Sequence, residues 1–278
     1  GDVLLYEADV ATLAPRTWLG DLVIAFFFEL FAARLAGGEG ADLTAWAAAA
    51  ASASRPPGVI LLEPTVSYMA AMLGTAEALR EVLAVPRTAG APPLTQQMAE
   101  APLVLVPISD KADPDAAIGG SHWSLLAFRR VGAAPGAAAE CAFEHYDSAG
   151  GANAEQAHAV ARALAPLLVC APLPAGRSPA APSLSAAAAD VVLHQMRGPQ
   201  QANGHDCGVY TVAVAELLCA LSVAGQLPPL GVVPPAVRAL TPAHVDERRR
   251  GMRETVHAAR AVHAGKRVAC ASCITEES

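Results

Sequence analysis

Large aromatic side chains and charged side chains are both scarce in this sequence. Phe, Trp and Tyr make up 5% of the 278 residues and Asp, Glu, Lys and Arg make up 16%, whereas hydrophobic residues make up 53%. A composition this apolar excludes a wholly disordered chain. Much of the apolar fraction is alanine, as in the runs 47–51 and 186–189, so we expect a smaller core than the chain length suggests.

An excess of basic residues is also missing, because the net charge is −7. Binding to nucleic-acid phosphates needs a basic face, so we expect no nucleic-acid partner. The one basic cluster, Glu247 to Arg250, is short and mixed in sign, and we interpret it as a solvated helix face.

The chain has no uninterrupted apolar run suited to spanning a membrane. Residues 22–36 contain Glu29 and Arg34, and the uncharged stretch 217–237 contains four prolines, which a spanning helix would not tolerate. The first residues, Gly1-Asp2-Val3, contain no basic residue of the kind that opens a signal peptide. We therefore expect no membrane partner.

Cysteine is sparse as well, with six residues in the chain. That number is too small for a disulfide scaffold and favours a reduced setting, so we expect a cytoplasmic or nuclear protein. Cys270 and Cys273 form half of a zinc-binding spacing, which His257 and His263 would have to complete. We interpret these two cysteines as part of the chain's tail and expect neither a metal nor a cofactor.

The order of the expected elements predicts an α+β fold in a single domain over residues 1–278. Two segments rich in alanine and proline, near 83–102 and 171–189, are interpreted as insertions into that domain. The hydrophobic patterns predict helices at 21–35, 64–73, 153–164, 208–221 and 241–263, and strands at 103–106, 122–128, 141–147 and 190–196.

Cys207 lies directly before the most apolar of these helices, after the turn Asn203-Gly204-His205-Asp206. Unpaired backbone N–H groups at a helix N-terminus stabilise a thiolate, which is the placement that a nucleophile needs. Asp206 can cap the same helix. The alternative is a buried structural cysteine at the start of the helix.

A histidine and an aspartate lie where they could serve such a thiol. If the runs 122–128 and 141–147 pair end to end, with Phe128 opposite Cys141, then His122 faces Asp147 at a Cβ separation of about 5 Å. Cys, His and Asp are the complete set for a thiol nucleophile. A His–Asp pair alone is more often structural, and His145 is a rival base on the same strand.

Two glutamines, Gln200 and Gln201, precede the turn to Cys207. A side-chain amide at this place can donate to a developing oxyanion beside the backbone N–H of Cys207.

Taken together, four segments resemble the Ulp/sentrin-specific cysteine protease family: Thr17–Asp21, Gly119–Leu126, Phe143–Ser148 and Gln201–Gly208. The second and third segments, together with Leu240-Thr241-Pro242-Ala243, are most similar to the deneddylases, the branch that acts on the NEDD ubiquitin-like modifier. Two residues depart from the family pattern, since Gly20 replaces an asparagine and His205 replaces a tyrosine.

The resemblance implies a papain-like (Ulp-type) α+β fold with a central, mostly antiparallel sheet flanked by helices. It also implies that His122 is the general base, Asp147 its orienting group, Cys207 the nucleophile and Gln201, rather than Gln200, the oxyanion donor.

Trp18 and Trp123 would flank a narrow tunnel for the Gly-Gly tail of the modifier, because flat indoles can clamp a glycine backbone and exclude bulkier residues. Asp21 either touches that tail or is only a helix cap.

We therefore expect a monomeric thiol isopeptidase or peptidase that cleaves after the C-terminal Gly-Gly of a ubiquitin-like modifier. The resemblance favours a NEDD-type modifier, which the enzyme would process from its precursor and remove from conjugates such as modified cullins. The alternatives are the same chemistry on SUMO or ubiquitin, acyl transfer by the same thiol, and a module that binds a ubiquitin-like protein without cleaving it.

Overall fold

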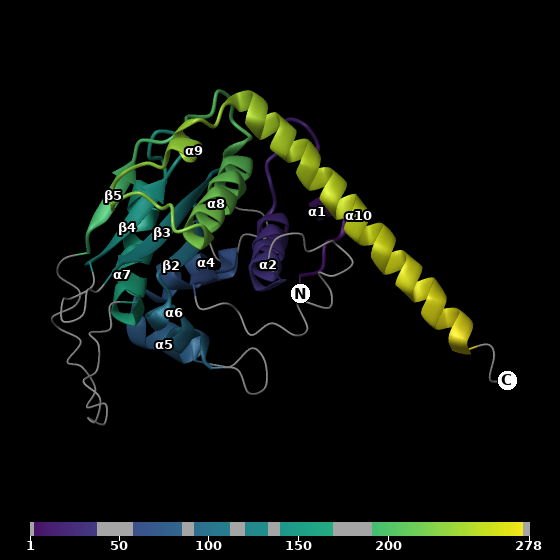
Figure 1. Cartoon of the computed structure of the whole chain (residues 1–278), viewed down its shortest axis with the longest axis horizontal. Helices are drawn as coiled ribbons and strands as arrows, with labels where there is room; N and C mark the ends of the chain where they lie inside the picture. The colour runs from purple at the N-terminus through teal and green to yellow at the C-terminus, as the bar shows by residue number, and fades with distance from the viewer. Residues whose placement is uncertain are drawn as a thin grey trace.

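The computed structural model describes residues 3–37, 58–84, 92–111, 120–132, 140–168 and 191–274, with side chains left out at 36, 37 and 262–274. Its elements in chain order (Figure 1) are α1 (Glu7–Ala11), α2 (Asp21–Gly37), β1 (Val59–Leu61), α4 (Pro64–Leu73), α5 (Ala76–Leu83), α6 (Leu94–Glu100), β2 (Leu103–Ser109), β3 (Trp123–Val131), β4 (Glu140–Tyr146), α7 (Ala154–Leu168), β5 (Leu193–Met196), α8 (Cys207–Val223), α9 (Pro235–Arg238) and α10 (Pro242–Ile274). The predicted helices and strands all occur, and β1, α1, α5, α6 and α9 are additional.

The five strands form one mixed sheet in the order β1-β2-β3-β4-β5. The two inner pairings, β2–β3 and β3–β4, are antiparallel, as expected. Both edge strands instead run parallel to their neighbours. The reason is that helices intervene between β1 and β2 and between β4 and β5, and a helical crossover returns the chain in the same direction.

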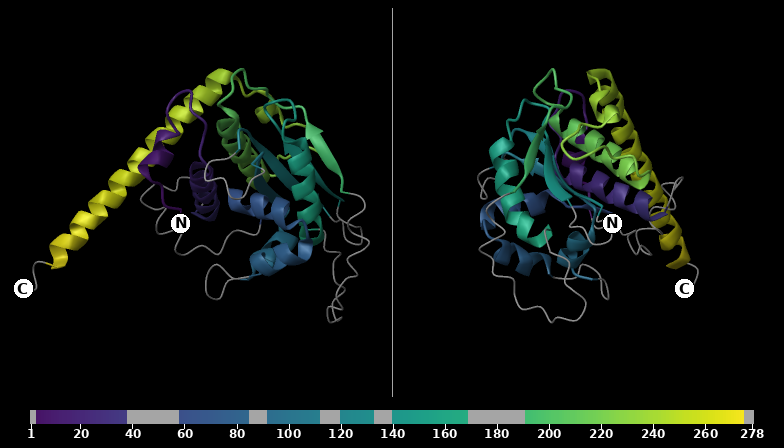
Figure 2. Two further views of the ribbon diagram at one scale, coloured as in Figure 1. Left: turned by 180° about the vertical axis from the view of Figure 1, so that it is seen from behind. Right: turned by 60° about the vertical axis from the view of Figure 1, so that its left-hand side comes forward.

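Helices cover both faces of the sheet, which creates two cores (Figure 2). Helices α2, α8 and α10 pack on one face, and α4 to α7 pack on the other. Strand β2 is therefore apolar up to Ile108, with Leu103 and Leu105 in the first core and Val104 and Val106 in the second. Among the described residues, no helix is both long enough and apolar enough to cross a bilayer.

The few phenylalanines of this chain are concentrated in these cores. The chain has six, and all are buried: Phe26, Phe27, Phe28 and Phe31 on α2, and Phe128 and Phe143 on β3 and β4. Phe128 and Phe143 face each other across the β3–β4 pairing with ring centroids 5.3 Å apart. The phenylalanines thus fill the interior between the sheet and its helices, although aromatic residues are scarce overall.

The pairing of β3 with β4 differs from the predicted register by two residues. Phe128 pairs with Phe143, whereas the sequence predicted Cys141 as its partner. The aromatic pair Phe128–Phe143 accounts for the shift, because facing aromatic side chains stabilise an antiparallel pairing. A shift of two leaves every side chain on its predicted face, because side chains alternate along a strand.

Part of the expected insertion near 83–102 belongs to the core. Residues 94–100 form α6, and its Leu94 and Met98 are buried against α7 and the sheet. Residues 85–91 of this segment, and all of the expected insertion at 171–189, lie outside the described residues.

The interpretation of Glu247 to Arg250 as a solvated helix face is wrong for its two middle residues. Arg249 is only 5% exposed, and Arg248 is partly buried over the rings of Phe27 and Phe31 at 5.6 and 5.7 Å from their centroids. The cause is that α10 packs along the N-terminal part of the chain, so this face of the helix meets protein and not solvent.

A buried ion pair ties the loop between α8 and α9 to the sheet. Fully buried Glu144 accepts hydrogen bonds from Arg129 Nη1 at 2.8 Å and from the backbone N–H of Gly231 at 2.9 Å. Its second oxygen accepts from the Tyr146 hydroxyl at 2.9 Å, and Arg129 Nη2 donates to the carbonyl of Pro228. Removing one partner of such a pair leaves an uncompensated buried charge.

We expect the substitution Arg129→Met to lower the free energy of unfolding by about 3–5 kcal/mol, measured by chemical denaturation. The control is Arg260→Met, which removes the exposed Arg260–Glu7 pair and should change stability by less than about 1 kcal/mol. Equal effects of the two substitutions would contradict a structural role for the buried pair.

Candidate active site

Cys207 is the first residue of α8, and its side chain is buried. Gly208 lets the start of this helix pack closely on the segment before α2, because a Cβ at that position would lie 2.7 Å from the Cβ of Leu19. Asp206 occupies the N-cap position, as predicted, but its side chain makes no capping hydrogen bond, which corrects its expected role. Its carboxylate binds Arg249 and Asn203 instead.

The structure brings His122 and Asp147 together, with His122 Nε2 2.7 Å from Asp147 Oδ1. His122 directly precedes β3 and Asp147 directly follows β4, so the two inner strands deliver both side chains to one edge of the sheet. The pair is therefore diagonal and not directly opposed, and the imidazole of His122 still reaches the carboxylate of Asp147.

The carboxylate of Asp147 also organises the turn that follows it. It accepts the backbone N–H of Ala149 at 2.7 Å and that of Asn153 at 2.9 Å. The turn can close this tightly because Gly150 and Gly151 adopt positive φ angles of 69° and 89°, which favour glycine.

These contacts set the charge of the pair. Burial alone would raise the pKa of Asp147, but hydrogen bonds from His122 and from the backbone of Asn153 and Ala149 lower it to about 2. Burial alone would lower the pKa of His122, but hydrogen bonding and charge from Asp147, and also from Cys207, raise it to about 9. At neutral pH the pair is an imidazolium beside a carboxylate, and a cation beside Cys207 favours its thiolate.

Two positioning residues around His122 were missed by the sequence reasoning. The side chain of Asn153, fully buried, donates to the carbonyl oxygens of Ile108 and His122 and to the hydroxyl of Ser124. The carboxylate of Asp110 accepts the backbone N–H of His122 at 2.9 Å. The one available signal for Asn153 was the glycine pair before it at the start of a predicted helix. In such turns an asparagine side chain can form hydrogen bonds with nearby backbone groups.

His145, the rival base, is engaged by other side chains through both of its ring nitrogens. Its ring is buried, with Nδ1 2.7 Å from Gln195 Oε1 and Nε2 2.9 Å from Ser124 Oγ. Burial lowers the pKa of His145, so the ring is neutral at physiological pH. Both of its nitrogens are occupied, and it supports Ser124 in the layer behind His122.

The two glutamines have separate contacts. Gln200 Nε2 donates to the carbonyl of Asp147 at 3.1 Å, so Gln200 supports the turn after β4. Gln201 lies in the loop before Cys207, where its Nε2 donates to the carbonyl of Asn203 at 2.6 Å and its Oε1 accepts from Ser148 Oγ at 2.8 Å.

The two tryptophans that the family resemblance points to lie next to the Cys207 loop or the start of α8. Trp18 is 52% exposed, and its Nε1 donates to the carbonyl of Gly204. Trp123 is partly buried, and its Nε1 donates to the carbonyl of Leu19 at 3.0 Å. Asp21 is exposed at the first position of α2, where its Oδ1 accepts the N–H of Leu22 at 2.8 Å.

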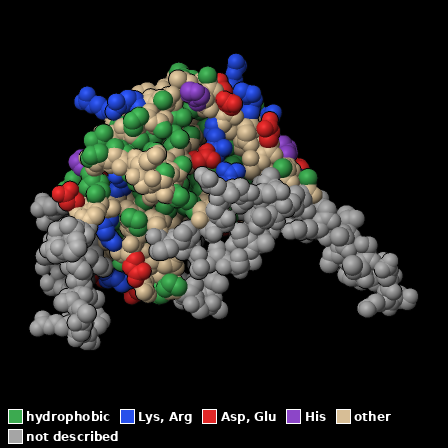
Figure 3. Space-filling model, viewed as in Figure 1, with side chains coloured by type: hydrophobic (Ala, Val, Ile, Leu, Met, Phe, Trp, Pro, Cys, Tyr) green, Lys and Arg blue, Asp and Glu red, His purple; other side chains and the backbone are tan. Residues whose placement is uncertain are grey.

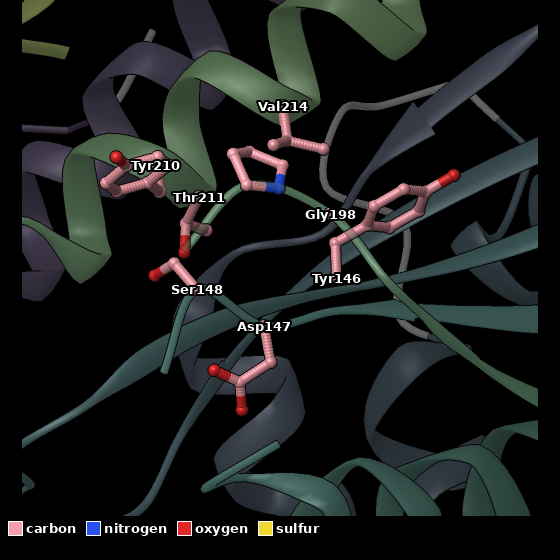
Figure 4. Close-up of a pocket in the computed structure, with 8 residues that line it drawn as sticks. Tyr146, Asp147, Ser148, Gly198, Tyr210, Thr211 and Val214 are labelled. Carbon is pink, nitrogen blue, oxygen red and sulfur yellow. The ribbon is translucent and has the colours of Figure 1, made fainter. Parts of the chain in front are cut away.

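A small cavity of about 10 Å³ lies between the end of β4 and α8, with room for one water molecule at most. Figure 4 shows the Asp147 carboxylate turned away from Tyr210 and Thr211 across this space. It is too small for a substrate. Within the part of the chain that the structure describes, no three His, Cys, Asp or Glu residues gather to hold a metal, and the side chains of Cys270 and Cys273 lie outside that part.

We expect iodoacetamide at neutral pH to modify Cys207 before Cys219, because burial raises the pKa of the Cys219 thiol to about 12. Replacing His122 by alanine removes the neighbouring cation and should slow modification of Cys207 by about tenfold or more. Peptide mass spectrometry over a time course measures both rates. An unchanged Cys207 rate in His122→Ala would contradict a thiolate–imidazolium pair.

The chain is similar in sequence to proteases from several organisms. It is 26% identical to sentrin-specific protease 8 of Homo sapiens over 248 residues, which cover 89% of this chain and 90% of that protein. It is 25% identical to probable sentrin-specific protease 8 of Dictyostelium discoideum over 222 residues, covering 80% and 74% of the two chains. It is 24% identical to NEDD8-specific protease 1 of Arabidopsis thaliana over 219 residues, covering 78% and 73%.

The fold is similar to that of solved proteases. A SUMO protease Ulp1, with its catalytic cysteine oxidised to a sulfonic acid, aligns with a TM-score of 0.55 at 16% identity over 93% of this chain and 87% of that chain. A de-sumoylating protease aligns with a TM-score of 0.57 at 12% identity over 94% and 88%. Residues 87–257, more than half of the chain, match the C-terminal catalytic domain of the Ulp1 protease family. The chain therefore belongs to the Ulp1 family of cysteine proteases.

Proposed function

We propose that this chain is a thiol isopeptidase and peptidase that cleaves after the C-terminal Gly-Gly of a ubiquitin-like modifier, with NEDD8 as its preferred modifier. The observation that carries the proposal is the 2.7 Å contact between His122 and Asp147, beside a cysteine at the start of a buried helix. The preference for NEDD8 is supported by the name of the relative from Arabidopsis thaliana.

In this proposal Cys207 is the nucleophile and His122 the general acid and base. The Cys207 thiolate attacks the carbonyl carbon of the modifier's last glycine and forms a tetrahedral intermediate. As the C–N bond breaks, His122 gives its proton to the leaving amine, which is a lysine ε-amine in a conjugate or a peptide nitrogen in a precursor. Water then attacks the thioester while His122 accepts a proton, and the free carboxylate and the thiolate are released.

Two donors are proposed to stabilise the oxyanion: the backbone N–H of Cys207 and the side-chain amide of Gln201. The backbone N–H lies at the first helical position, where no intrahelical acceptor is available. The Gln201 amide donates to Asn203 in the free enzyme, so it must exchange that carbonyl for the oxyanion when substrate binds.

The tail of the modifier is proposed to run between Trp18 and Trp123 to reach Cys207. Both indole nitrogens are bonded to backbone carbonyls, which holds the rings rigid. Rigid flat walls accept a glycine backbone and reject larger side chains. Asp21 is assigned to the rim of this path, as an exposed carboxylate that also begins α2.

The alkaline limb of kcat/KM should fall near pH 9, because the protonated form of His122 is lost as pH rises through its pKa of about 9. The substitution Asp147→Asn removes the charge and hydrogen bonding that raise this pKa, and burial then lowers it. The alkaline limb should therefore move to lower pH, measured with a fluorogenic modifier fusion. A limb that stays in place in Asp147→Asn would contradict the role assigned to Asp147.

The modifier itself is tested with NEDD8, SUMO and ubiquitin that each carry a C-terminal electrophile. We expect the NEDD8 probe to label the wild type and Cys141→Ala, a control with a thiol remote from the site, and not to label Cys207→Ala. The readout is a gel shift of about one modifier mass.

Labelling by the SUMO or ubiquitin probe alone would reassign the substrate. Stable binding of an unmodified modifier, with no labelling by any probe, would show a binding module without catalytic activity.

A further inference from the structure

Arg249 of α10 is almost fully buried, and its guanidinium makes hydrogen bonds through all three nitrogens. Its acceptors are backbone carbonyls and one carboxylate: Thr12 O at 3.1 Å, Ala14 O at 3.2 Å, Thr17 O at 3.0 Å, His205 O at 3.1 Å, and Asp206 Oδ1 at 2.9 and 3.2 Å. Charge-assisted bonds of this kind are the strong ones in proteins, and a planar guanidinium is the group that can make so many at once.

These bonds join three parts of the chain that are far apart in sequence. The first is the loop between α1 and α2, which contains Trp18, and the second is the loop that ends at Cys207. The third is α10, which runs along the N-terminal segment (Figures 1 and 2). The two loops have no regular secondary structure where Arg249 binds them. Hydrogen bonds to Arg249 therefore hold the backbone of these loops in place where no helix or strand does.

The contacts of Arg249 continue toward the proposed oxyanion donor. The other oxygen of Asp206 accepts from Asn203 Nδ2 at 2.7 Å. The carbonyl of Asn203 in turn accepts the amide of Gln201 at 2.6 Å. The carbonyl of Gly204, in the same loop, accepts the indole of Trp18. The loop is thus one hydrogen-bonded unit anchored at Arg249.

Arg249 also neutralises a buried charge next to the nucleophile. Asp206 is 3% exposed and adjoins Cys207 in the chain, so an unpaired carboxylate there would oppose formation of the thiolate. Among the described residues, the charged and titratable groups that face Cys207 or its loop include His122 and Asp147 from the end of the sheet, His205 and Asp206 from the loop itself, and Arg249 from α10. His205 Nε2 is 4.0 Å from Asp206 Oδ2, and the guanidinium at 2.9 Å is the permanent cation of the group.

We propose that Arg249 is a positioning residue of the active site, which neutralises Asp206 beside Cys207 and holds the Trp18 segment against the Cys207 loop. The part concerning cleavage rests on the proposed function, whereas the part concerning the thiol does not. Basic side chains at the surface, coloured blue in Figure 3, can be hydrated. Arg249 is instead enclosed by the backbone that it binds, so solvent cannot replace its contacts.

The experiment compares Arg249→Met, Arg249→Lys and the double variant Asp206→Asn/Arg249→Met with Arg250→Met, a control at the exposed neighbouring position of the same helix. The first measurement is the rate of Cys207 modification by iodoacetamide as a function of pH, which needs no protein substrate. The second is kcat and KM for cleavage of the modifier fusion. Thermal melting of each variant establishes that it is folded.

In Arg249→Met the pH at which Cys207 becomes reactive should rise by about one unit, because the Asp206 charge is no longer neutralised. In the double variant and in Arg249→Lys it should return close to the wild-type value. Lysine restores the charge but cannot reach every carbonyl, so KM for the modifier should stay raised in Arg249→Lys. Arg250→Met should match the wild type in both measurements.

Identical pH profiles for the wild type and Arg249→Met would overturn the proposal, as would an equal shift in the single and double variants. If Arg249→Met does not fold, the other two variants decide, since a wild-type KM in Arg249→Lys would also overturn it. Absence of cleavage of any modifier by the wild type would contradict the proposed function and leave the thiol measurement valid.

Discussion

The hydrogen bond between His122 and Asp147 is the interaction around which the site is arranged. It requires the ends of β3 and β4 to lie at one edge of the sheet, and it requires a carboxylate that stays ionised in a buried place. The turn of residues 148–153 meets the second requirement by donating two backbone N–H groups to Asp147. Gln200 donates a hydrogen bond to the carbonyl of Asp147, so the same residue also helps to position the loop that leads to Cys207.

Much of this arrangement could be predicted from the sequence, because the strands and the buried helix have clear patterns and the candidate site residues lie at their ends. The predicted contact between His122 and Asp147 is confirmed although the predicted register is not. The contact forms in either register because a shift of two residues keeps both side chains on the same face of the sheet. The register itself depends on the pairing of Phe128 with Phe143, and no local pattern distinguishes that pairing from its neighbours.

The interpretations that failed have a common cause. Asp206 was expected to cap its own helix and Arg249 to face solvent, and each instead finds its partner in a distant segment. Local preference is a fair guide where a polar side chain can be satisfied by its own turn or by water. It fails where a loop without secondary structure needs buried donors or acceptors, since the partner is then supplied by the tertiary fold. Asn153 and Asp110 were missed for the same reason.

One pattern in the sequence does mark Arg249, although its meaning emerges only with the fold. Val245, Met252 and Val256 are the buried apolar residues of α10 among those whose side chains are described, and Arg249 lies four residues after the first and three before the second. That spacing places all four on one face of the helix. A helix that packs by this face must bury the arginine, and burial of a permanent cation is tolerated only where acceptors surround it. The same face therefore both closes the core against α2 and α8 and delivers a guanidinium to the loop before Cys207. On this argument an arginine within an apolar helical stripe indicates a buried network of acceptors, and in this chain that network adjoins the proposed nucleophile.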